Sequence, residues 1–152
     1  MYVAAALTPL SAELLKWMIR ATIKLEDKGY KFKTSQGSPL PHHMTINLGE
    51  FDSDLNNIEI LGLKAELFIE ELVYNDTIGI AAAPVRLARI IEEKPYGMIV
   101  NSKNICPHIT LCSKEGVLSR LSNNMLELPH NSNQRFRLEE RLRLEARISY
   151  CK

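Results

Sequence analysis

The chain has 152 residues, of which 24% are charged, and 19 Lys and Arg residues nearly balance 18 Asp and Glu residues to give a net charge of +1. This size and composition are typical of a single globular domain over residues 1–152. The balanced charge argues against a protein that coats long nucleic acid, whereas a small anionic ligand needs only a local pocket. No apolar run approaches the length that crosses a membrane, so no membrane partner is expected.

The three cysteines are an odd number, which does not indicate a disulfide framework. Cys106 and Cys112 are six residues apart on one predicted strand, about 20 Å if that strand is extended, so they are too far apart to bridge. Residues 1–7 are apolar but short and carry no charged leader, so we expect a strand there and no signal peptide. These features favour a reduced, cytoplasmic protein.

The first third of the chain predicts a strand and then a helix. Residues 2–7 are a buried-strand candidate, and Thr8-Pro9 predicts a helix start, because Thr caps helices and Pro fits the first turn. Lys28-Gly29 predicts its end. We expect Trp17 to pack at the edge of the buried helix face, which consists of Leu14, Leu15, Met18, Thr22 and Leu25.

The rest of the chain predicts mainly strands. Residues 63–73 favour a strand, although their Lys, Ala, Glu and Leu content leaves a helix open. The other expected elements, in order, are an irregular loop over 31–41, a strand over 43–48, a turn at Asn75-Asp76 that makes a hairpin with 78–82, a strand over 98–100, a turn over 101–104, a strand over 108–111, a helix over 113–121, a loop over 123–133 with a solvated His130, and a strand over 141–150.

Two short motifs are the strongest indication of function. His43-Met44-Thr45-Ile46 and His108-Ile109-Thr110-Leu111 each consist of a His, any residue, a Thr and an apolar residue. Strand side chains alternate between faces, so each motif places its His and Thr on one face and its apolar residues on the other. His42 has the opposite parity to Thr45, which favours His43 as the functional histidine of the first motif.

Paired His and Thr residues suit general acid–base chemistry on a phosphodiester. One imidazole can accept a proton while the other donates one, and the Thr hydroxyls can hydrogen-bond the phosphate oxygens. A metal site is a rival reading, because Cys106, His108 and Cys112 share strand parity, but an extended strand spreads such ligands too far apart. A Cys–His nucleophilic pair is the other rival, although that spacing does not by itself create one.

These motifs, with the strand and helix predicted over Tyr2 to Pro9 and beyond, resemble the 2H phosphoesterase superfamily. Their exact forms and the compact size look most like the phage anti-CBASS nucleases within it. The resemblance implies a bilobal, pseudo-twofold α+β fold in which antiparallel sheets surround a central cleft and helices lie outside. It also implies catalytic His43, Thr45, His108 and Thr110, with no metal and no cofactor, and the host cytoplasm as location if the protein is viral.

The same resemblance implies cleavage of the 3′–5′ bonds of cyclic di- or oligonucleotide second messengers, which would counter bacterial CBASS immunity. Base contacts are expected from an aromatic or acidic group, and the candidates are Tyr2, Tyr74, Glu140 and Tyr150. Three alternatives stay open: a 2′,3′-cyclic nucleotide phosphodiesterase or RNA-end-processing enzyme, a module that sequesters nucleotides without cleaving them, and an interaction domain whose motifs are accidental. The sequence does not determine the base preference, the ring size or the oligomeric state.

Overall fold

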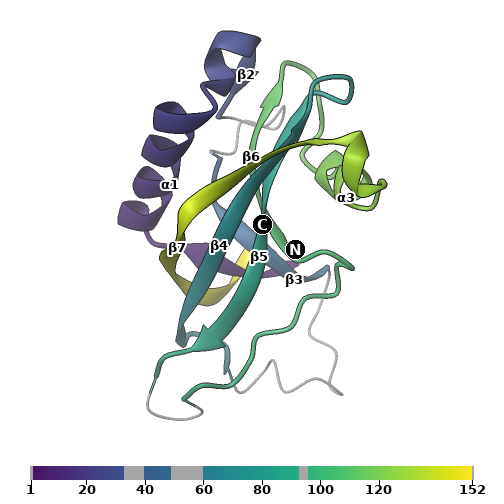
Figure 1. Ribbon diagram of the computed structural model, residues 1–152. Coiled ribbons are helices and arrows are strands. Elements are labelled where there is room, and N and C mark those ends of the chain that lie inside the picture. Colours follow the sequence, from purple (N-terminus) through teal and green to yellow (C-terminus); the bar gives the residue numbers. More distant parts are fainter. Residues whose placement is uncertain (1, 33–39, 49–59, 93–95, 152) are drawn as a thin grey trace.

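The computed structural model describes residues 2–32, 40–48, 60–92 and 96–151. It is a mixed α+β structure, which confirms the predicted fold class (Figure 1). Its elements, in chain order, are β1 (Tyr2–Leu7), α1 (Pro9–Thr22), the 3₁₀ helix η1 (Leu25–Lys28), β2 (Tyr30–Lys31), β3 (His43–Leu48), β4 (Lys64–Asn75), β5 (Ile80–Ile90), β6 (His108–Lys114), α3 (Leu121–Leu126), the 3₁₀ helix η2 (His130–Ser132) and β7 (Gln134–Cys151).

The described strands form one antiparallel sheet that closes on itself. Their order is β2-β6-β3-β1-β7-β4-β5, and β5 also pairs with β6, which completes a closed barrel. Strand β6 therefore lies between β5 on one edge and β3 and β2 on the other. This closure places the two His-containing strands, β3 and β6, next to each other although 65 residues separate their motifs.

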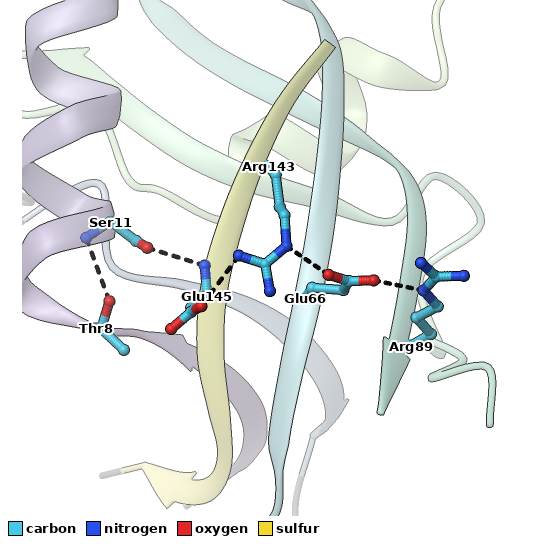
Figure 2. Close-up of polar contacts among 6 residues, drawn as sticks. All are labelled: Thr8, Ser11, Glu66, Arg89, Arg143 and Glu145. Atoms are coloured by element: carbon cyan, nitrogen blue, oxygen red, sulfur yellow. Dashed lines mark hydrogen bonds and ion pairs between the residues drawn. The ribbon is translucent and has the colours of Figure 1, made fainter. Parts of the chain in front are cut away.

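Helix α1 begins as predicted, and its buried face agrees with the predicted one only in part, at Leu15. The Thr8 hydroxyl accepts a hydrogen bond from the Ser11 amide at 3.2 Å, which is an N-cap. The Ser11 hydroxyl accepts a hydrogen bond from the Glu145 amide of β7 at 2.8 Å, and this contact turns Ser11 toward the sheet (Figure 2). The buried residues are consequently Ser11, Leu15 and Ile19, whereas Leu14 is 40% exposed and Trp17 is 62% exposed, so the packing predicted for both was wrong.

The sheet has an apolar cluster on each of its two faces. The main core contains Leu15 and Ile19 of α1, together with inward side chains such as Met44 and Ile109. A second cluster lies under α3 on the opposite face and is built from Val73, Ile80, Ala82, Met125 and Leu126. In Figure 1, α1 and α3 accordingly lie on opposite sides of the strands.

Several predicted elements of the second half were wrong. Strand β6 continues to Lys114 and a turn follows, so no helix forms over 113–120. Helix α3 instead occupies part of the stretch predicted as a loop, although His130 is exposed as expected. Ile99 forms only an isolated bridge with Arg89 in place of a strand. Most of the loop expected over 31–41 lies outside the described residues, and the two-lobed, pseudo-twofold arrangement stays a prediction.

Candidate active site on strands β3 and β6

The antiparallel register between β3 and β6 brings both motifs together. Met44 is the partner of Ile109, and continuing this register by one residue on each side sets His43 opposite Thr110 and Thr45 opposite His108. Residues directly opposite in an antiparallel pair share one face of the sheet. The two His and two Thr residues therefore form a four-residue group, which we call the His/Thr quartet.

The quartet lies on the face of the sheet that points away from the main core. Met44 and Ile109 are fully buried in that core, and the alternation of strand side chains directs their neighbours to the opposite face. His43 and His108 are diagonal neighbours across the two strands, a relation that typically separates Cα atoms by about 7–8 Å.

The ring nitrogens of His108 both have protein partners. Nδ1 lies 2.7 Å from the carbonyl oxygen of Cys106, which can only accept, so Nδ1 carries a proton. Nε2 lies 2.8 Å from the hydroxyl of Ser122. The side chain is buried, and burial lowers the pKa of His108, while the Cys106 carbonyl opposes that shift.

Ser122 of α3 connects His108 to Thr110. Its hydroxyl is 2.9 Å from Thr110 Oγ1 and donates to the carbonyl of Ser119 at 2.7 Å. When His108 is cationic, its Nε2–H donates to the Ser122 oxygen, and the Ser122 hydroxyl can keep donating to the carbonyl of Ser119. When His108 is neutral, Nε2 has a lone pair and Ser122 must turn its proton toward it. The orientation of this single hydroxyl proton therefore follows the charge of His108.

His43 has a different environment from His108. Its ring packs 4.9 Å from the ring of Tyr2 and 5.1 Å from the ring of His42. Its Nδ1 is buried and has no hydrogen-bond partner among the described residues. Burial first, and then the neighbouring His42 and His108, lower the pKa of His43 to about 4. This imidazole is therefore neutral at pH 7 and available as a proton acceptor.

The thiols of Cys106 and Cys112 do not pair with His108. His108 contacts Cys106 through its main chain, while the Cys106 thiol lies 3.7 Å from the carbonyl of Leu126. An irregularity in the β5–β6 register, between Ala81 and Ala82, changes the side-chain parity and puts Cys112 in the main core. Burial raises the pKa of Cys112 to about 12, so it stays a thiol, and the prediction that Cys112 shares a face with Cys106 and His108 was wrong. Among the described residues, no group of three or more His, Cys, Asp or Glu side chains could hold a metal ion.

Of the predicted substrate contacts, the structure brings Tyr2 to the quartet through its ring contact with His43. Tyr74 packs against the main core on the other face, with its ring 6.3 Å from that of Tyr30. Tyr150 is the partner of Val3 and is 48% exposed, and Glu140 is exposed on β7. The sequence did not single out Ser122, because nothing local indicates that α3 lies over β6.

Comparison with protein-family models finds none that matches the chain, and comparison with curated protein sequences also finds no match. Among the helices of the described residues, none has the length and apolar character needed to cross a membrane.

Proposed function

We propose that this protein is a metal-independent phosphodiesterase that uses His43 and His108 as a general acid–base pair. The observation that carries the proposal is the His/Thr quartet, because two imidazoles and two hydroxyls share one face of adjacent strands. Each group has a role in phosphodiester cleavage: one His takes a proton, the other gives one, and the Thr residues stabilise charge on the phosphate. Imidazoles suit these tasks better than Lys or Arg, which would only bind the anion.

The environments of the two histidines support a division of roles. His43 has the lowered pKa of about 4 and a buried, unpartnered Nδ1, so its neutral form is the stable one at pH 7 and it acts as the base. His108 has a carbonyl on Nδ1 and a hydroxyl oxygen on Nε2, both of which can accept protons from an imidazolium. We assign His108 as the acid, with Nε2 as the donating nitrogen; burial opposes the protonated form that this role needs, and the Cys106 carbonyl on Nδ1 and the Ser122 hydroxyl on Nε2 stabilise it.

The reaction follows from these roles. The substrate's 2′-hydroxyl loses its proton to His43 as its oxygen forms a bond to phosphorus, and the bond from phosphorus to the 5′ oxygen breaks as His108 protonates that oxygen. The products are a 2′,3′-cyclic phosphate end and a 5′-hydroxyl. Thr45 and Thr110 donate to the non-bridging oxygens. A phosphate oxygen that binds between His108 and Thr110 takes the position that Ser122 Oγ holds in the free protein.

The substrate class comes from the resemblance to anti-CBASS nucleases described above. We propose cyclic di- or oligonucleotides as substrates, for which one cleavage opens the ring and inactivates the messenger. The proposal includes the two-lobed arrangement of the 2H phosphoesterases, with β3 and β6 contributing one motif from each half of the chain.

A second candidate function, sequestration of a nucleotide without cleavage, is favoured by one observation. His108 is 5% exposed, and both of its ring nitrogens are already hydrogen-bonded. An imidazole held in this way could serve as a fixed part of a binding face.

Product analysis in the presence of EDTA separates the two functions. Cyclic di-AMP and its 2′-deoxy analogue are each incubated with the protein, and the products are resolved by chromatography. We expect a linear product with a 2′,3′-cyclic phosphate end from cyclic di-AMP and none from the analogue. Rapid cleavage of the analogue would refute attack by the 2′-hydroxyl, a requirement for metal would refute the acid–base mechanism, and binding without products would establish sequestration.

A further inference from the structure

A row of directly opposite residues runs from His43 of the quartet across the sheet and ends at two cationic side chains. His43 is the partner of Ala6 on β1, Ala6 is the partner of Arg147 on β7, and Arg147 is the partner of Lys64 on β4. Directly opposite residues share a face, so all four side chains point away from the main core. Ala146 and Ile148, which flank Arg147, are buried in that core, which agrees with this direction.

Lys64 and Arg147 are like charges set directly opposite each other, an arrangement that destabilises a sheet unless an anion compensates it. Among the described residues, neither side chain forms an ion pair with a carboxylate. Arg147 donates to the carbonyl of Gly62 at 2.7 Å, which orients the guanidinium without neutralising it. The carboxylate of Glu92 accepts from the main-chain amide of Lys64 at 3.2 Å, and the Lys64 ammonium is exposed.

The next row on the same face contains a second pair of like charges, and the protein compensates this pair with its own side chains. Glu66 and Glu145 are also directly opposite each other. Arg143 bonds Glu66 at 2.5 Å and Glu145 at 3.0 Å, and Arg89 bonds the other oxygen of Glu66 at 2.5 Å (Figure 2). The acidic pair is thus compensated by Arg143 and Arg89, whereas the basic pair beside it has no carboxylate ion-pair partner among the described residues.

Ala6 is the only residue between His43 and Arg147 in this row, and its side chain is a single methyl group. Two strand spacings separate these backbones by about 10 Å, and the Arg147 guanidinium, which bonds Gly62 on the β4 side of β7, must turn toward β1 to meet a ligand that extends from the quartet. A ligand with one phosphate at the quartet can therefore present a second anionic group to Arg147 and Lys64.

We propose, on the basis of the phosphodiesterase function proposed above, that Arg147 and Lys64 bind a second phosphate of the substrate. They form a subsite that selects nucleotides with at least two phosphates over mononucleotides. Arg147 supplies the planar donors that recognise phosphate, and Lys64 adds a second positive charge.

Calorimetric binding of two ligands tests this subsite. The ligands are the 2′-deoxy analogue of cyclic di-AMP, which has two phosphates and lacks the attacking hydroxyl, and 2′,3′-cyclic AMP, which has one. Arg147→Gln should weaken binding of the two-phosphate ligand about tenfold more than that of the one-phosphate ligand, the scale of one charge-assisted hydrogen bond. Arg137→Gln, on the same strand and 78% exposed, removes the same charge elsewhere and is the matched control.

The outcomes separate the subsite from the proposed cleavage. The subsite would be overturned if Arg147→Gln weakened the binding of both ligands equally or of neither, or if the Arg137 variant weakened binding to the same extent. It would also be overturned if the native protein did not bind the two-phosphate ligand. Selective weakening in a native protein that leaves cyclic di-AMP intact would support the subsite and refute the phosphodiesterase function.

Discussion

Because the pKa of His43 is lowered in the folded protein, we expect protonation of this residue to lower the stability of the fold as the pH falls. In the unfolded chain the imidazole has its ordinary pKa of 6.5, and in the folded protein the pKa is lowered to about 4. The unfolded state therefore binds the proton first as the pH falls, so the contribution of His43 to stability is complete above pH 6.5 and is lost on acidification toward pH 4.

The magnitude follows from these two values. The full shift corresponds to at most about 3 kcal/mol, and the part lost between pH 7 and pH 5 is about 2 kcal/mol. His42 and His108, whose pKa values are also lowered by burial, add to the loss in the native protein. The contribution of His43 is therefore the difference between the native protein and a His43→Gln variant.

Urea unfolding at pH 7 and pH 5 measures this difference. We expect the native protein to lose about 2 kcal/mol more than His43→Gln over this interval, and the His130→Gln variant, in which an exposed ring is removed, to behave like the native protein. Equal losses in the native protein and the His43 variant, or a native protein that gains stability as the pH falls, would refute the assignment of a buried, neutral imidazole.

Three further substitutions probe the site and its support. Ser122→Ala should lower stability by about 1–2 kcal/mol because His108 and Thr110 lose a buried partner, and it should lower KM because the phosphate position is vacated; loss of kcat at unchanged KM would contradict this. Glu66→Gln should lower the free energy of unfolding, measured in urea, by about 2 kcal/mol, because two arginines lose a buried carboxylate. An unchanged urea midpoint would show that these two ion pairs do not stabilise the fold. Thr8→Ala should cost about 1 kcal/mol by loss of the N-cap, and a loss well below that would mean that Pro9 alone starts the helix.

Local patterns predicted the parts of this fold that depend on neighbouring residues. The capping by Thr8, strand β1 and the alternation along β7 as far as Ile148 all follow from residues within one element, and the structure confirms them, whereas Tyr150 is exposed. The two His-x-Thr motifs were each placed on a strand with the expected parity, because alternation needs no tertiary information.

The failures arise where tertiary contacts override local preference. The bonds of Ser11 and Thr8 to β7 turn α1 so that Ser11 and Ile19 are buried beside Leu15, while Leu14 is 40% exposed. Pairing with β5 and β2 extends β6 to Lys114, where the composition had favoured a helix. Ser122 and Arg147 could not be selected from the sequence, because each reaches the quartet face only through strand order and the position of α3.

The most direct test of the central claim is cleavage of cyclic di-AMP, with EDTA present, by the native protein and by the His43→Ala and His108→Ala variants. Circular dichroism first establishes that each variant is folded. We expect the native protein to cleave and each variant to lose at least about a hundredfold in kcat, which is the usual contribution of a general acid or base. Full activity in both folded variants would contradict the acid–base role of the His/Thr quartet.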